Sequence, residues 1–282
     1  MQLFHKLVFL GCLSTFSILW AVPGTLENTD YKINFSETLP GVDSQPMTLG
    51  GPVIYVDVTD KFRSQGTRFP LEVYAINQYF LDDDRLNLIC RTTPRDTFHQ
   101  LYSFIQLNLT DHQDSRQFQG MEKFFFSPDN RFLVAAFDQG GPPESIGFIR
   151  LSQGPARLGW LYSEKEKLNL FQKALPEIGK HLSLASVVGW MADSLTAVFV
   201  LSENVGTAES PVLKYYLTCL YLEEDGFKVA AEAVDLSPYQ LPDGGMIDTI
   251  SCSGDHATLY FQPKDLSGTS QADFKLPKTP DH

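Results

Sequence analysis

The stretch Phe126-Ser127-Pro128-Asp129-Asn130-Arg131-Phe132-Leu133-Val134 decides the fold class of this chain. An aromatic residue ends one apolar run, and Pro128 presets φ for a turn. Asp129 and Asn130 tolerate tight turn geometry and hydrogen-bond their own backbone. A second run of β-forming residues then begins at Phe132. The stretch predicts two strands joined by a short turn, with Asp129 as a turn residue and not a ligand.

The same pattern recurs along the chain. Besides Phe126-Ser127-Pro128-Asp129, the copies are Phe80-Leu81-Asp82-Asp83, Trp190-Met191-Ala192-Asp193 and Cys252-Ser253-Gly254-Asp255, each followed by an apolar run rich in β-forming residues. The repeating residues Asp83, Asp129, Asp193 and Asp255 are spaced by 46, 64 and 62 residues. Such a period predicts stacked β-hairpins or propeller blades, with these four Asp residues in the repeat turns.

The copies that start at Phe126 and Trp190 resemble the repeat signature of TolB-type β-propellers, and the other two depart from it. The resemblance covers about half of the chain. It implies a ring of four-stranded blades that often binds proteins or small ligands at one face, with catalysis in a minority of members. Four units would close a ring if Val53–Val58 supplied the outer strand of the last blade. We therefore expect an all-β, propeller-like fold, with a β-sandwich as the alternative.

One helix is expected to interrupt the strands. Ser163-Glu164-Lys165-Glu166 has the pattern of a capping box, and apolar residues follow at helical spacing until Pro176. We expect a short helical insert near residues 163–175. The remaining domain boundaries are a loosely ordered leader at 22–50, a single β-repeat domain at 51–276 and a tail at 277–282, because Pro277 and Pro280 discourage strand pairing.

The N-terminus has the anatomy of a secretory signal peptide. A weakly basic start precedes the uncharged, mainly apolar stretch 7–20, and Ala21 lies before Val22-Pro23-Gly24. The apolar stretch is short for a membrane span, so we expect residues 1–21 to be removed and the protein to be exported, either periplasmic or secreted. The alternatives are an uncleaved anchor at residues 7–20 and lipidation at Cys12.

Composition limits the partners. The formal charge is −12, from 22 Lys and Arg against 34 Asp and Glu, and loss of Lys6 with the signal peptide gives 21 − 34 = −13. This charge disfavours nucleic acid and suits a basic protein face. After cleavage at Ala21 an odd number of cysteines is left (Cys90, Cys219 and Cys252), so they cannot all pair within one chain.

No motif predicts a catalytic centre, a metal site or a cofactor. The acidic run Asp82-Asp83-Asp84 lacks the alternating ligands and the glycine of a calcium loop, and His181 and His256 stand without a base or nucleophile set by spacing. The leading hypothesis is an exported, non-catalytic binding or scaffold protein that contacts a protein or a component of the cell envelope. The rivals are an extracytoplasmic hydrolase or lyase with its site at one rim, and a membrane-tethered accessory subunit.

Overall fold

The computed structural model describes residues 25–38, 52–111, 115–138, 145–151, 154–163, 165–174, 176, 182–207, 210, 212–223, 226–230, 232–236, 247–261 and 270–277. These residues form antiparallel strands in four hydrogen-bonded sheets, with one short helix. The prediction of an all-β fold is confirmed. The expected signal peptide at 1–21, including Cys12 and residues 7–20, lies outside the described residues.

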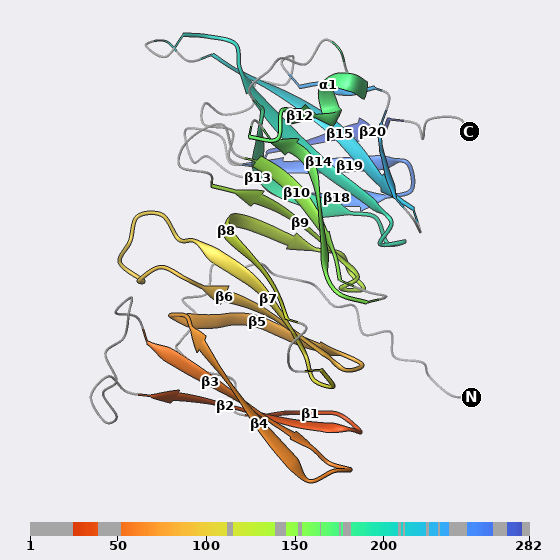
Figure 1. The fold of residues 1–282 in the computed structure, drawn as a ribbon. Helices are drawn as coiled ribbons and strands as arrows, with labels where there is room; N and C mark the ends of the chain where they lie inside the picture. The colour runs from red at the N-terminus through yellow and green to blue at the C-terminus, as the bar shows by residue number, and fades with distance from the viewer. Residues whose placement is uncertain are drawn as a thin grey trace, which may run out of the picture.

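The sheets follow one another along the chain (Figure 1). The first contains β1 (Thr25–Glu27), β2 (Tyr31–Thr38), β3 (Val53–Asp60) and β4 (Gln65–Glu72). The second contains β5 (Ala75–Asp82), β6 (Arg85–Arg91), β7 (Tyr102–Asn108), β8 (Arg116–Phe126), β9 (Phe132–Phe137), β10 (Ser145–Arg150), β11 (Arg157–Ser163) and β12 (Leu168–Asn169). The third contains β13 (Leu182–Trp190), β14 (Thr196–Asn204), β15 (Leu213–Leu222), β16 (Phe227–Val229) and β17 (Val234–Asp235). The fourth contains β18 (Ile247–Ser253), β19 (His256–Phe261) and β20 (Ser270–Lys275).

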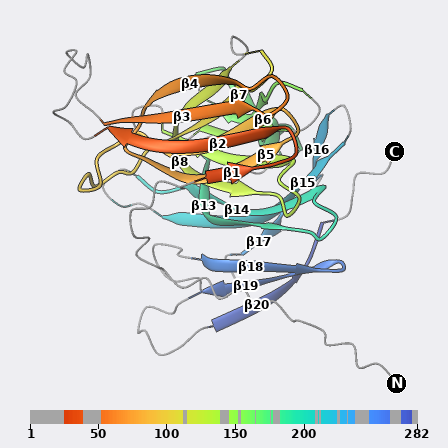
Figure 2. The ribbon, with the colours of Figure 1, turned by 90° about the horizontal axis from the view of Figure 1, so that it is seen from below.

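The eight-stranded sheet is two units that share β8. The first part of β8 pairs with β7, and the part after Met121 pairs with β9. Gly120 lies between them at φ +78°, where a side chain is strained, and a Cβ there would come within 3.2 Å of the Asp138 carbonyl. The two halves of this sheet and the three other sheets therefore make 2 + 3 = 5 blade-like units, which stack face to face (Figures 1 and 2).

Each gap between successive units is filled by its own apolar cluster. Ile33 and Val56 of the first unit meet Leu88 of the second, and Phe274 of the last unit packs in a cluster with Val200 of the fourth. Strand β9 shows how the middle units are held, because all six of its residues are buried. Phe132, Val134 and Ala136 contribute to one cluster, and Leu133, Ala135 and Phe137 contribute to the other. A strand buried on both faces reads as a continuous apolar run, which is why β9 was predictable.

The stack is open. Its first and last units lie at opposite ends in both views (Figures 1 and 2). Their outer faces are polar: Arg68 pairs with Asp57 at 2.6 Å and lies over Tyr55, and in the last unit Thr258 donates to Asp273 at 2.6 Å. Polar outer faces are typical of the terminal units of repeat arrays. The expectation that Val53–Val58 closes a ring is wrong, since β3 pairs with β2 and β4 inside the first unit.

The structure also corrects two expected boundaries. Residues 25–38, placed in a loosely ordered leader, form β1 and β2, because Tyr31, Ile33 and Phe35 alternate and are buried. Ser270–Lys275, in the last part of the expected domain 51–276, forms β20 along the whole of β19. Pro277 belongs to the domain as well, because the Tyr221 hydroxyl donates to its carbonyl at 2.6 Å. Residues 278–282 lie outside the described part.

The helical insert is present but starts later than the capping box predicts. Ser163 does accept a hydrogen bond from the Glu166 backbone at 3.4 Å, yet β11 continues to Ser163 and a turn follows. Helix α1 (Leu170–Ala174) begins after Asn169, whose side chain accepts from Gln172 N at 2.8 Å. Among the described residues no helix has the length and apolarity to cross a membrane.

Candidate functional site

All four repeat Asp residues lie in turns between the first two strands of their units. Each turn has one residue at positive φ: Asp83 (48°), Asn130 (57°), Ser194 (59°) or Gly254 (61°). Asp, Asn and Gly adopt this region most readily, which explains the residue type in three of the four turns; Ser194 holds it in the fourth.

The side chain of Asp193 shows the main task of the repeat position. Its Oδ1 accepts hydrogen bonds from Leu195 N at 2.8 Å and Thr196 N at 3.1 Å. Asn28 does the same for Asp30 N and Tyr31 N in the β1–β2 turn. The first unit therefore carries a fifth copy of the turn, which sequence reasoning missed because Asn replaces Asp.

The side chains of Asp129 and Asp255 make other contacts than that of Asp193. Burial raises the pKa of Asp129, but hydrogen bonds from Ser127 and from the Arg131 backbone and guanidinium outweigh it, so the pKa lies below its ordinary value. Asp255 pairs with His256 at 2.7 Å and with Lys275 at 3.7 Å. All of these contacts are local to their hairpins, as expected of turn residues.

Contacts between units bring the repeat turns to one edge of the stack. The Gln106 side-chain oxygen of the second unit accepts from Ala156 N of the third unit at 2.7 Å. Leu151 lies in the same β10–β11 connection as Ala156, and its N–H donates to the Arg131 carbonyl in the Asp129 turn. From the third unit, the Arg150 guanidinium donates to the Glu223 carbonyl of the fourth unit at 2.7 Å.

The last two units are joined at the same edge. Leu222 N donates to the Leu195 carbonyl in the Asp193 turn, and the neighbouring Tyr221 donates its hydroxyl to the Pro277 carbonyl. Leu276 N in turn donates to the backbone carbonyl of Asp255, in the repeat turn of the last unit. We call this side the turn edge, and it lies on the right in Figure 1.

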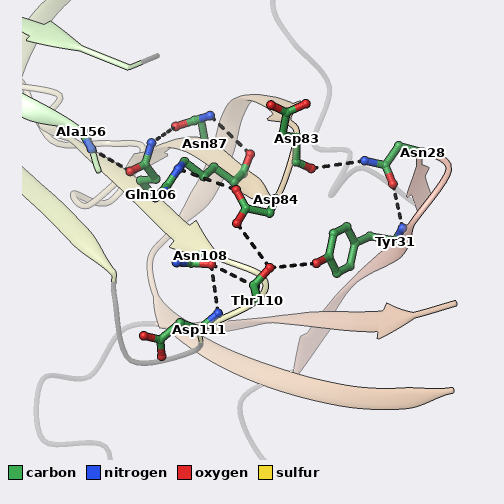
Figure 3. Close-up of polar contacts among 11 residues, drawn as sticks. Asn28, Tyr31, Asp83, Asp84, Asn87, Gln106, Asn108, Thr110, Asp111 and Ala156 are labelled. Carbon is green, nitrogen blue, oxygen red and sulfur yellow. Dashed lines mark hydrogen bonds and ion pairs between the residues drawn. The ribbon is translucent and has the colours of Figure 1, made fainter. Parts of the chain in front are cut away.

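A polar network joins the first two units at the turn edge (Figure 3). The Thr110 hydroxyl donates to Asp84 at 3.3 Å and lies 3.2 Å from the Tyr31 hydroxyl, while the Asn28 amide donates to the Asp83 carbonyl at 3.4 Å. Inside the second unit the Gln106 amide donates to the buried Asn87 at 2.9 Å. The network fixes the first unit against the second through directional bonds.

A pocket opens beside this network, between the β3–β4 turn and the end of β7. Its polar lining residues are Tyr31, Asp60, Arg63, Gln65, Thr67 and Thr110. The pocket has a volume of about 130 Å³ and opens into solvent. Phe62, in the turn that forms one wall, is 79% exposed.

The opposite side, which we call the loop edge, carries the connections between the second and third strands of the units. The connection 92–101 between β6 and β7 is well ordered. The Gln100 amide lies 2.8–3.1 Å from the carbonyls of Pro94, Arg95 and Thr97, and Thr92 bonds Leu101 across the base. We call residues 92–101 the Phe98 loop.

This loop holds a large aromatic side chain in water. Phe98 is 95% exposed, the highest value among the large hydrophobic residues described, and its main ring contact is with His99 at 5.0 Å. On the same edge, three apolar residues at the tip of the β14–β15 hairpin are also exposed: Val205 (45%), Val212 (53%) and Leu213 (45%). Apolar side chains held out of the core by ordered backbone are typical of binding surfaces.

The first strands of four units each carry a β-bulge towards the loop edge. The pairing skips Asn77 in β5, Glu122 in β8, residues 185–187 in β13 and Asp248 in β18. Glu122 is thereby aimed at the Phe98 loop, with its carboxylate 3.7 Å from His99 Nδ1. Bulges redirect side chains in this way. The sequence signal of these bulges is a polar residue six or seven positions before the repeat Asp.

The candidates for chemistry remain scattered. Asp255 and His256 are neighbours in an exposed turn, and no cluster of three or more His, Cys, Asp or Glu that could hold a metal occurs among the described residues. His181 lies outside them. Cys90, Cys219 and Cys252 are free thiols in the structure, and burial raises the pKa of the first two to about 12 and of the third to about 11. Such thiols are poor nucleophiles at neutral pH.

No family model and no curated protein match the chain. Among solved structures it is similar to an acylaminoacyl peptidase from Pyrococcus horikoshii, at 10% identity and a TM-score of 0.38, over 68% of this chain and 28% of that one. It is also similar to the tricorn protease (10% identity, TM-score 0.38, 84% of this chain and 23% of that one) and to TolB from Acinetobacter baumannii (14%, 0.30, 79% and 46%). The chain thus spans less than half the length of each of these proteins. The resemblance to TolB-type β-propellers is weak and partial.

Proposed function

We propose that this protein is an exported, non-catalytic binding or scaffold protein whose loop edge contacts another protein or a component of the cell envelope. The observation that carries the proposal is Phe98, which is 95% exposed on a loop whose conformation is fixed by Gln100. A loop ordered before binding loses little entropy on association, and an exposed aromatic ring is a typical anchor.

The charge of the chain favours a basic partner face. At −12 the protein attracts cations over long range, and the exposed apolar residues of the loop edge would supply the short-range contact. Export is supported by the signal-like segment 1–21, and it is tested by the mass of the mature chain, which should begin at Val22.

Photo-crosslinking in the native host tests the contact. The full-length chain carries p-benzoylphenylalanine in place of Phe98 or, as the control, of Phe62, an exposed aromatic on the turn edge. We expect one discrete covalent adduct from position 98 and none from position 62. Adducts from position 62 alone, or from neither position, would contradict the proposal.

Phe98→Ala then measures the contribution of the ring. Because the side chain is almost fully exposed, thermal stability should not change, while affinity for the crosslinked partner should fall at least tenfold, as for a typical interface anchor. Phe62→Ala should leave that affinity unchanged.

A further inference from the structure

The pocket at the turn edge has the lining of a binding site for an uncharged polar molecule. It contains one carboxylate, Asp60, and one guanidinium, Arg63, whose Nε lies 3.7 Å from Asp60 Oδ2. The two charges offset each other, so the pocket does not select for an anion or a cation. The nearby Asp84 is engaged by Thr110 and lies 3.7 Å from Arg85.

The other polar groups can both donate and accept hydrogen bonds. Tyr31, Thr67 and Thr110 present hydroxyls, and Gln65 presents an amide. The hydroxyls of Tyr31 and Thr110 are oriented in advance by the chain of hydrogen bonds that ends at Asp84 (Figure 3). Groups of this kind match the alternating donors and acceptors of a hydroxyl-rich ligand, because each ligand hydroxyl also does both.

The pocket also has an apolar part, which is lined by Val58 and Leu109. Asp60 Oδ1 fixes the turn that forms one wall by accepting from Phe62 N at 2.8 Å and Arg63 N at 2.9 Å. Apolar side chains next to polar groups suit a pyranose, which has apolar C–H faces and a rim of hydroxyls.

We propose that the pocket between the first two units binds a neutral sugar of hexose size, free or as part of a glycan, through Asp60, Arg63, Gln65, Tyr31 and Thr110. The site is independent of the partner contact proposed for Phe98, because it lies on the opposite edge of the stack. Failure of one proposal therefore leaves the other standing.

Saturation-transfer NMR with the full mature chain tests the site. The probes are glucose, galactose, mannose and N-acetylglucosamine, and the hexasaccharide of whichever sugar binds. We expect saturation transfer from at least one hexose, with the strongest effect on its C–H protons. Tighter binding of the hexasaccharide would assign a glycan ligand, and equal binding would assign the free sugar.

Variants locate the binding. Gln65→Ala and Asp60→Asn should each raise the dissociation constant at least fivefold, whereas Gln78→Ala, which removes an exposed glutamine outside the pocket, should not change it. Gln65 is exposed, so its loss does not endanger folding. Absence of saturation transfer from all four hexoses would overturn the proposal, as would unchanged binding in both pocket variants.

Discussion

At the scale of single residues, the repeat Asp is a structural device whose value differs between units. Asp193 caps two backbone N–H groups of its own turn, while Asp255 contacts the exposed His256 and Lys275 side chains and its own backbone. Surface ion pairs contribute little to folding stability, whereas a backbone N–H left without a hydrogen-bond acceptor lowers it. The same residue type at the same repeat position is therefore expected to differ in importance.

Asp193→Ala and Asp255→Ala test this difference. We expect Asp193→Ala to lower the free energy of unfolding by about 1–2 kcal/mol, because two hydrogen bonds from backbone N–H groups and one from the Thr196 hydroxyl are lost. Asp255→Ala should cost clearly less. Urea denaturation of the two variants measures both, and equal losses would show that the Asp193 cap adds nothing.

The acidic run at the first repeat turn predicts a pH effect. Burial, followed by repulsion from Asp83, raises the pKa of Asp82 above its ordinary value. The folded state therefore holds this proton more tightly than the unfolded state, and the free energy of unfolding falls as pH rises through the interval above pH ~4. Asp82→Asn removes that loss, so it should stabilise the protein at pH 7 and have little effect at pH 3.

Asp129 provides the control of opposite sign. Its pKa is lowered, so its contribution is present above the unfolded pKa and is lost as pH falls through the folded pKa. Asp129→Asn should therefore destabilise the protein at pH 7. Urea midpoints at pH 7 and pH 3 measure both variants, and a shift of the same sign for both at pH 7 would refute this assignment.

At the scale of the elements, the sequence predicted strands best where both faces are buried or where a repeat turn bounds them. The run of β-forming residues expected to begin at Phe132 is strand β9 (Phe132–Phe137). The sequence predicted strand boundaries poorly where local signals competed with tertiary packing. In β2 the flanking polar and glycine-rich residues outweighed the alternation of Tyr31, Ile33 and Phe35, and at Ser163 a capping pattern was overridden by pairing of β11 with β10 and β12.

The candidate site was the least predictable part. The repeat turns followed from residue type, but the exposure of Phe98 depends on Gln100 contacts within its loop, and the pocket depends on how the first unit packs on the second. Neither is a property of a local stretch of sequence. The repeated bulges were accessible in principle, because a polar residue interrupts the apolar alternation of β5, β8 and β18 at a similar distance from each turn.

Packing between elements predicts the effect of one methyl group. A Cβ on Gly189 of β13 would lie 2.7 Å from Ile250 Cγ2 and 2.9 Å from Cys252 Sγ of β18, so these strands must approach closely. Gly189→Ala should lower the free energy of unfolding by about 1–3 kcal/mol, because it overpacks this contact. Gly66→Ala, in β4, has its nearest neighbour at 3.8 Å and should cost less. Thermal melting compares the two, and equal melting temperatures would show that β13 and β18 are not in tight contact.

At the scale of the whole molecule, five units form an open stack with a turn edge and a loop edge. In a stack the apolar cores are local, since each unit packs only on its neighbours. The polar faces of the first and last units then need no partner, and the loop edge is free to receive one.

The distance between the two end units tests this arrangement most directly. Cys residues are introduced at Lys32 of β2 and Gln271 of β20, both of which are exposed, and are spin-labelled. Pulsed electron–electron double resonance then measures the distance between the two labels. Cys90 and Cys219 are buried and Cys252 is half-buried. All three native thiols should stay unlabelled at neutral pH because their pKa values are raised, and a measured mass that corresponds to two labels per chain checks this. With sheets packed about 10 Å apart, four intervals predict a separation on the order of 40 Å. A single distance near one sheet spacing, roughly 10 Å, would mean that the ends meet in a closed ring and would contradict the open stack.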